Sequence, residues 1–476
     1  MAVDIGREQG KTNCLSGGAR IFRPALLAAA LLVLRADLPA AGTPPSESPL
    51  QKRIDRAAPG DTIAVPPGIY EGNIVINKRL AVIGTGKPVI RGAGKGSAVT
   101  ITSDSCIVRG LAIEHCGAML VDEDAGILVK SSGNTIADND LRDVLFGIYF
   151  YHADRNVTVN NRVTGRKYLE LGERGSGIHI WNSRGNAFYR NIITDERDGF
   201  YIQNASRMHI EDNEVYALRY GLHYMYADSN EFIGNAFHDN VAGAAIMYSN
   251  GIIMRRNRFQ HNRGFASFGI LFQDCHGSVA DSNIVTDNVV GLFFEGSTGN
   301  LFSHNVIAGN DAALEMFQNS TENTFTGNNF IDNLTPLLLV GKETRTRWNL
   351  GGVGNYWSSY DGYDLDGDGI GDIPMKIQNV FQYLEGKNQN LRLYLYSPAS
   401  QALAAATYAF PLIDINRETD DRPLMRPLEF SFARAAGPPE RPAGAGLRLW
   451  PWISAIAFGA FLWAFVFRLR AVHDSR

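Results

Sequence analysis

Three side chains near the middle of this 476-residue sequence have the type and spacing to bind a soft metal ion. His223 and Met225 are two residues apart, and Met247 follows Met225 after a further 22 residues. Residues i and i+2 of a β-strand point to the same face, and imidazole with thioether is a ligand set that suits Cu(I) rather than Mg²⁺ or Ca²⁺. We therefore predict a copper site, with His179 as a more distant candidate ligand. Packing of the same side chains without a metal is the competing interpretation.

A second group, nearer the C-terminus, consists of carboxylates. Asp364, Asp366, Asp368 and Asp372 lie in a glycine-rich turn at mostly alternating positions. Oxygen-rich loops of this kind wrap Ca²⁺, so we predict a calcium site. The loop departs from an EF-hand because its twelfth position is Met375 rather than Glu. A polar turn without an ion is the alternative.

The elements that must position the first group repeat along the chain. A glycine followed by an apolar strand recurs about every 22 residues, at Gly126, Gly147, Gly177, Gly199, Gly221, Gly243, Gly269 and Gly291. A row of asparagines keeps the same spacing: Asn139, Asn161, Asn191, Asn213, Asn235, Asn257, Asn283, Asn305 and Asn328. Both rows lengthen at 163–176 and at 262–267, which we interpret as loop insertions.

A unit of this length is too small to bury its own apolar face, so the units must stack. Period-two alternation without amphipathic helices makes each unit all-β. The sequence therefore predicts a right-handed, single-stranded parallel β-helix of the pectin-lyase-like type, with coils about 4.8 Å apart. The Asn row is predicted to tolerate left-handed turn conformations and to form hydrogen bonds from coil to coil.

Numbering each coil from its glycine predicts which side chains face outward. Positions +1 and +3 are nearly all apolar and should fill the core, so positions +2 and +4 should face solvent. The outward positions are rich in rings, His and Met, which is typical of a contact surface. Besides the candidate copper ligands, this predicted partner-binding face comprises Tyr149, Tyr151, Trp181, Tyr201, Gln203, Gln273 and Phe293. The alternative is that a lateral loop covers the stripe.

Carboxylates are scarce on this stripe. Glu295 is the single acid that we place there, whereas a glycosidase needs two carboxyl groups roughly 5–10 Å apart. The sequence therefore disfavours the enzymatic use of this scaffold. A net charge of −4 is also too balanced to suggest binding to nucleic acid.

The two ends of the sequence predict export and membrane attachment. An apolar run at 24–34, preceded by basic residues and followed by small ones, predicts a signal peptide over 1–42. The uncharged stretch 449–467, with three tryptophans and arginines beyond it, predicts one transmembrane helix and a cytoplasmic stub at 468–476. Three cysteines lie after the signal peptide, an odd number without a CxxC motif, so we expect free buried thiols.

Between these ends we expect three further parts. A β-helix with an N-terminal cap, which begins as a short helix at Leu50–Ala58, should occupy 50–348. A C-terminal cap carrying the acidic loop and a tail should occupy 349–430, and a linker 431–448 should lead to the membrane helix.

Several segments together resemble a known family. The first strands at 64–73, the Gly and Asn repeats, the block GNYWSSYDGYDLDGDGIGDIP at 354–374 and the tail DRPLMRP at 421–427 are similar to the NosD-type maturation proteins of nitrous-oxide reductase. The repeats alone are shared with pectin-active enzymes and alginate epimerases. The block and the tail are more specific, and the resemblance extends from about Leu50 to Phe430.

The resemblance implies a periplasmic, copper-binding accessory protein without catalysis of its own. Such proteins work with the ATPase and permease subunits of an ABC transporter, and copper passes through a partner chaperone to the copper–sulfur centre of the reductase. We expect Arg422, Met425 and Arg426 of the tail to contact the permease, and the 449–467 helix to anchor the body at the inner membrane. The alternative function is a polysaccharide (uronate) lyase, hydrolase or epimerase on the same scaffold.

Overall fold

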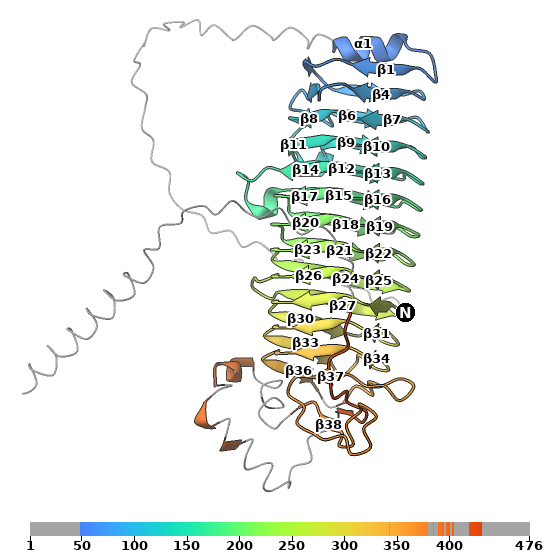
Figure 1. Cartoon of the computed structure of the whole chain (residues 1–476). Helices are drawn as coiled ribbons and strands as arrows, with labels where there is room; N and C mark the ends of the chain where they lie inside the picture. The colour runs from blue at the N-terminus through green and yellow to red at the C-terminus, as the bar shows by residue number, and fades with distance from the viewer. Residues whose placement is uncertain are drawn as a thin grey trace, which may run out of the picture. The chain divides into compact units, whose positions relative to one another are not determined.

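The described part of the chain is an all-β solenoid, as the repeats predict. The computed structural model describes residues 48–341, 343–378 and 418–430, with short pieces between 384 and 403. The strands form three long parallel sheets that run the length of the solenoid, and each coil gives one short strand to each sheet (Figure 1). Within these three sheets, neighbouring strands come from adjacent coils, so side chains of equivalent positions form columns.

The first two sheets carry the shorter strands, mostly of three residues. Sheet A consists of β1 (Thr62–Val65), β4 (Ala81–Gly84), β7 (Ile107–Arg109), β10 (Thr135–Ala137), β13 (Val157–Val159), β16 (Ala187–Tyr189), β19 (His209–Glu211), β22 (Glu231–Ile233), β25 (Ile253–Arg255), β28 (Val279–Asp281), β31 (Leu301–Ser303) and β34 (Thr324–Thr326). Sheet B consists of β2 (Ile69–Glu71), β5 (Val89–Arg91), β8 (Ala112–Glu114), β11 (Asp140–Val144), β14 (Arg162–Gly165), β17 (Ile192–Thr194), β20 (Glu214–Tyr216), β23 (Ala236–His238), β26 (Arg258–Gln260), β29 (Ile284–Thr286), β32 (Val306–Ala308), β35 (Asn329–Ile331) and β37 (Tyr356–Trp357).

Sheet C carries the longer strands and the candidate copper ligands. It consists of β3 (Ile74–Ile76), β6 (Val99–Ile101), β9 (Ala125–Val129), β12 (Phe146–Tyr151), β15 (Ser176–Trp181), β18 (Asp198–Gln203), β21 (Tyr220–Met225), β24 (Ala242–Asn250), β27 (Phe268–His276), β30 (Val290–Glu295), β33 (Ala312–Phe317) and β36 (Thr335–Val340). The repeated glycines lie in these strands. A Cβ at Gly199 would lie 2.3 Å from the Val215 side chain, so the core leaves no room for a larger residue.

A short helix covers the first coil. Helix α1 (Pro49–Arg56) agrees with the helix predicted over Leu50–Ala58, and its proline stands in the first turn, where the missing N–H costs nothing. Leu50 and Ile54 are four residues apart, share one face, and are fully buried against the apolar interior. The helix thereby shields an end of the solenoid that would otherwise expose unpaired strand edges.

The Asn row forms the predicted ladder, but not in the predicted backbone conformation. Asn213 donates from its backbone N–H and its Nδ2 to Oδ1 of Asn235, at 3.0 and 2.9 Å, and Asn235 repeats this toward Asn257. The left-handed residue is the one that precedes each asparagine, such as Asp212 with φ 56°. That residue makes the turn, which directs the following amide inward, where it is buried and satisfies backbone groups.

The tail closes the far end of the solenoid. The ladder runs through Asn355 to the buried carboxylate of Asp420, which accepts the Asn355 backbone N–H at 2.7 Å and the Trp357 Nε1–H at 3.1 Å. Asp420 lies in β39 (Thr419–Asp420), which pairs antiparallel with β38 (Met375–Lys376). A carboxylate suits this place because it accepts several hydrogen bonds and ends the chain of donors.

Four of the predicted segments lie outside the described residues: the signal peptide 1–42, the linker 431–448, the membrane helix 449–467 and the stub 468–476. Among the helices that the structure describes, none has the length and apolar character needed to cross a bilayer.

Candidate functional site

The predicted register of sheet C is confirmed around the candidate copper ligands. Leu222 and Tyr224 are fully buried in the core, while His223 and Met225 lie between and beyond them on the outer face, half-buried. Met247 is the direct neighbour of Met225 on the next coil. The neighbour of His223 on that coil is a small residue, Ala245. The three candidate ligands therefore share one face of two adjacent strands. Met225 and Met247 are about one strand spacing apart, and His223 and Met225 are two residues apart on one strand.

The outward stripe is not solvent-exposed along its whole length, which corrects the prediction at two residues. Tyr149 and His179 face outward but are 1% and 7% exposed. Phe146 packs on both rings, and Tyr201 stacks on His179 at 4.4 Å between ring centroids. Burial, with a smaller contribution from the guanidinium of Arg197, lowers the pKa of His179 to about 3, so its imidazole is neutral. Its Nδ1 has no hydrogen-bond partner among the described residues.

The other members of the predicted partner-binding face retain exposed surface. Tyr151 is the most exposed, and Trp181, Tyr201, Gln203, Gln273 and Phe293 are half-buried. The Tyr201 hydroxyl donates to Gln203 Oε1 at 2.7 Å, which fixes both side chains on the face of β18. Closure of the stripe is therefore limited to Tyr149 and His179, while Tyr151 and Trp181 on the same two strands keep exposed surface.

A buried carboxylate that the sequence reasoning missed holds His223. Asp198 is fully buried at the start of β18, with one of its oxygens 3.2 Å from His223 Nδ1. Arg219 donates to both of its oxygens at 3.0 and 2.8 Å, and Arg197 donates from 3.2 Å. Burial alone would raise the pKa of Asp198, but the hydrogen bonds from His223 and Arg219 outweigh it and hold the pKa below its ordinary value. Asp198 is therefore ionised.

Alternation of the strand could not have revealed this residue. Asp198 precedes the coil glycine Gly199 by one position, and strict alternation from +2 and +4 assigns such an odd position to the core. Its contact with His223, an outward +2 residue, shows that the strand departs from alternation at the glycine. The interpretation counted positions +2 and +4 alone. For His223, the consequence is a fixed ring orientation: an Nδ1–H that donates to Asp198 leaves the Nε2 lone pair for a metal ion.

The expectation of a single acid on the stripe is wrong. Asp198 and Glu315 also lie on the outer face of sheet C. Glu315 is the neighbour of Phe293, so it lies diagonally to Glu295 on the adjacent coil, roughly 7–8 Å away. This spacing falls within the range of a glycosidase pair, but Glu315 is 7% exposed and therefore is not open to a polymer in this structure.

The acidic loop gathers three of its four carboxylates. Oxygens of Asp364, Asp366 and Asp368 all lie within 4.8 Å of one another. Asp364 accepts backbone N–H groups of the loop, first that of Gly369, and these lower its pKa. Asp372 instead accepts the backbone N–H of Leu365 at 2.6 Å and stands outside the cluster of three. The loop is thus a turn closed by its own backbone, with a compact group of acidic oxygens on its surface.

The tail lies against this acidic loop. Arg422 is 3.4 Å from a carboxylate oxygen of Asp368 and donates to the backbone of Gly352. The backbone N–H of Met425 donates to Gly369, and the Arg426 side chain is exposed. The tail is therefore part of the C-terminal cap, and the exposed Arg422 and Arg426 are its accessible candidate contacts.

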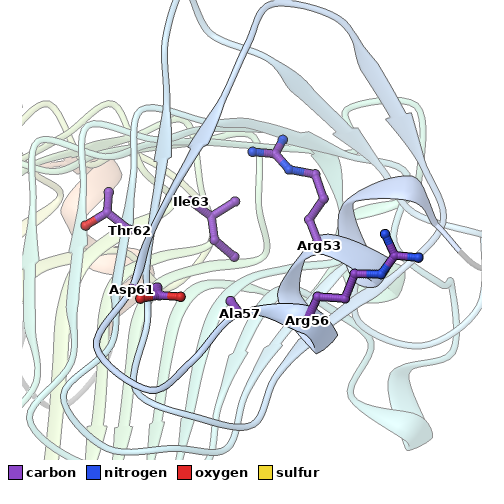
Figure 2. A pocket seen from close by; sticks show the side chains of 6 residues that line it. All are labelled: Arg53, Arg56, Ala57, Asp61, Thr62 and Ile63. Carbon is purple, nitrogen blue, oxygen red and sulfur yellow. The ribbon is translucent and has the colours of Figure 1, made fainter.

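Two further features lie away from the stripe. Cys106, Cys116 and Cys275 are free and buried, as predicted. A shallow pocket on the first coil is lined by Arg53, Arg56, Ala57, Asp61, Thr62 and Ile63, and two of these residues are arginines of α1 (Figure 2).

Comparison with known proteins agrees with this architecture. Residues 89–193 match a right-handed β-helix region, which confirms the predicted hand. The A-module of a mannuronan C-5 epimerase of Azotobacter vinelandii superposes with a TM-score of 0.52 at 14% identity, over 64% of this chain and 93% of that module. At this identity the likeness shows the fold alone.

Two relatives and a family description agree on the family. Residues 159–362 match the family described as periplasmic copper-binding protein (NosD). A probable ABC transporter binding protein NosD of Pseudomonas aeruginosa is 30% identical over 372 residues, which are 75% of this chain and 87% of the relative. The chain belongs to the NosD family. A second NosD, from Stutzerimonas stutzeri, is 28% identical over 76% of this chain and 86% of the relative. The resemblance stated from the sequence is thereby confirmed.

Proposed function

We propose that this NosD-family chain is a periplasmic, non-enzymatic accessory protein that binds Cu(I) on the outer face of sheet C. The family description and the names of both NosD relatives support copper binding, the periplasm and association with an ABC transporter. The observation that carries the copper proposal is the common face of His223, Met225 and Met247 across two paired strands.

The donor set fits a soft, monovalent ion. Two thioethers and one imidazole are neutral ligands, and Cu(I) is the first-row ion that favours them. Asp198 supplies the outer hydrogen bond that a metal-binding imidazole normally has on its second nitrogen. His223 Nε2, Met225 Sδ and Met247 Sδ would hold the ion. His179 lies two coils from His223, roughly 9.6 Å away, and serves as a packing residue beneath Tyr201 rather than as a ligand to the same ion.

A competition titration tests this site. Cu(I) is titrated into the protein in the presence of a chromophoric Cu(I) chelator, for the unsubstituted chain and for a triple variant with His223→Ala, Met225→Ala and Met247→Ala. A matched control carries Met119→Ala and His304→Ala, which change an exposed Met and an exposed His elsewhere. We expect the triple variant to lose high-affinity Cu(I) binding and the control to keep it. Equal affinity of all three proteins would remove the site.

We further propose that the copper serves maturation of the copper–sulfur centre of nitrous-oxide reductase. In this role the chain works with ATPase and permease subunits, a copper chaperone and the reductase. The stripe beside the copper site supports a docking role toward the chaperone or reductase, since its rings and amides keep exposed surface there. Reductase produced in cells that carry the triple variant should lack the sulfur-bridged copper absorption, while other copper enzymes keep theirs.

The C-terminal region is proposed to join the body to the transporter. The apolar stretch 449–467 would anchor the chain in the inner membrane, and the tail with Arg422, Met425 and Arg426 would contact the permease. Co-purification with the transporter measures this directly. Arg426→Glu should weaken it, whereas Arg345→Glu, on an exposed turn elsewhere, should not.

The acidic loop is proposed to bind Ca²⁺ through Asp364, Asp366 and Asp368, with Asp372 holding the loop closed. The compact oxygen cluster supports this proposal. Ca²⁺ should raise the apparent unfolding temperature of the protein, and Asp366→Asn with Asp368→Asn should abolish the rise.

The alternative function, a uronate lyase, hydrolase or epimerase, has its own test. Turnover of a uronate polymer by the purified protein would favour this alternative over the accessory role.

A further inference from the structure

Histidines and carboxylates alternate at the corner between sheets B and C. This corner is separate from the Met-rich face, by which we mean the outer face of sheet C around His223, Met225 and Met247. Asp239, His261 and Asp287 follow β23, β26 and β29 directly, and each has a left-handed backbone, with φ of 54°, 53° and 55°. They occupy the same corner position on three successive coils, so their side chains form one column with a spacing of about 4.8 Å. His238, the last residue of β23, adds a second imidazole next to Asp239.

His261 lies between two carboxylates. Its Nδ1 is 2.6 Å from Asp287 Oδ2, and its Nε2 is 3.9 Å from Asp239 Oδ1. Arg263 also binds Asp287, at 2.9 Å, and thereby fixes that carboxylate. An Nδ1–H that donates to Asp287 leaves the Nε2 lone pair directed toward Asp239.

His238 also lies between two carboxylates, and one of them is again Asp239. Its Nε2 is 3.3 Å from Glu214 Oε1, and its Nδ1 is 2.7 Å from Asp239 Oδ2. At 2.7 Å from a carboxylate oxygen, Nδ1 carries a hydrogen that it donates to Asp239, so a metal ion at this nitrogen would displace that proton. Each imidazole therefore has one carboxylate on its outer nitrogen and shares Asp239 on its inner nitrogen, which is the carboxylate–histidine–metal pattern of protein metal sites.

We propose that His238 Nδ1, His261 Nε2 and the Asp239 carboxylate bind a divalent transition metal ion of the Zn²⁺ or Cu²⁺ class. Imidazole and carboxylate suit these ions, and ligand bonds of about 2.0–2.1 Å in a tetrahedral site place the ligand atoms roughly 3.3 Å apart. The nitrogen–oxygen distances from Asp239 to His238 and His261, 2.7 and 3.9 Å, lie on either side of that value. The imidazoles contact opposite oxygens of Asp239, and the ligand atoms of the three residues do not all lie within 4.8 Å of one another. Binding would therefore require the side chains to turn toward one point.

Exposure permits that movement and leaves the ion accessible. The side chains of His238, Asp239 and His261 are 23%, 43% and 58% exposed. Three protein ligands leave an open position for water or an exchanging ligand. The site is chemically distinct from the Met-rich face, because nitrogen and carboxylate oxygen favour a divalent ion and thioether favours Cu(I). It does not depend on the proposed maturation role.

Titration of the purified full chain with Zn²⁺ alone, against a chromophoric chelator, tests this site. We expect one Zn²⁺ to bind, with affinity reduced at least tenfold by His238→Ala or His261→Ala. Asp287→Asn should weaken binding roughly 10–100-fold, as loss of an outer carboxylate does at other metal sites. Circular dichroism should show an unchanged fold, since these side chains are partly exposed.

Two controls separate the site from adventitious binding. His304→Ala removes a histidine of similar exposure that pairs with a single carboxylate, Asp281, and should leave the Zn²⁺ affinity unchanged. The triple variant at His223, Met225 and Met247 should leave it unchanged as well. Cu²⁺ bound at the site should give an electron paramagnetic resonance spectrum with hyperfine lines from two nitrogens. Equal Zn²⁺ affinity of the unsubstituted chain and the His238→Ala, His261→Ala double variant would overturn the proposal.

Discussion

Asp198→Asn is the most informative perturbation of the candidate copper site, because the change removes one charge and keeps the side-chain shape. Asp198 is fully buried and is bound by Arg197, Arg219 and His223. Removing one partner of a buried ion pair costs about 3–5 kcal/mol. The arginine side chains are 24% and 35% exposed, so water relieves part of the loss, and we expect an apparent destabilisation of about 2–3 kcal/mol.

The same substitution should weaken Cu(I) binding. In Asn a single neutral oxygen must accept from the arginines and from His223, so the hydrogen bond that fixes the His223 ring weakens. Loss of such an outer partner typically costs 10–100-fold in metal affinity. Urea unfolding and chelator competition on the same preparations measure the two effects. Asp138→Asn is the matched control, because Asp138 pairs with Arg109 at the exposed surface, where an ion pair contributes about 0–1 kcal/mol.

The pH dependence of the stability difference has a definite sign. The pKa of Asp198 is held below its ordinary value in the folded protein, so its stabilisation is present above the unfolded pKa near 4 and is lost as pH falls through the folded pKa. The destabilisation by Asp198→Asn should therefore be full at pH 7 and shrink in acid. A variant as stable as the unsubstituted chain at pH 7, with unchanged Cu(I) affinity, would refute both the ionic account and the orienting role.

Three further substitutions test the scaffold. Asn235→Ala leaves the donors of Asn213 without an acceptor in the core, and urea unfolding should show a loss of about 2–4 kcal/mol. Asp420→Ala removes the buried carboxylate that ends the ladder, so hydrogen exchange should accelerate in the last coils while the first coils stay protected; uniform protection would contradict the capping role. Burial lowers the pKa of His209, but hydrogen bonds to Glu211 and Glu231 outweigh this effect and raise the pKa above its ordinary value. His209→Ala should therefore destabilise the protein more at pH 6 than at pH 9, and a destabilisation that grows with pH would contradict this sign.

The candidate copper site shows which features of a site the repeat pattern of the sequence can predict. Repeat length and alternation predicted that His223, Met225 and Met247 share an outer face, because pairing between stacked coils fixes both register and spacing. They could not predict that the rings of Phe146 and Tyr201 close over His179, since burial depends on how neighbouring columns fill space.

The sequence by itself determined the β-helix, the family, the free thiols and the outward direction of the copper candidates, because each of these follows from local periodicity or a specific motif. The tertiary structure alone decided which charges meet. Asp198 reaches Arg219 and His223 from an adjacent coil, and Asp239 meets His261 in the same way. Such pairs are separated by more than 20 residues along the chain, and they form because stacking places equivalent positions one strand spacing apart.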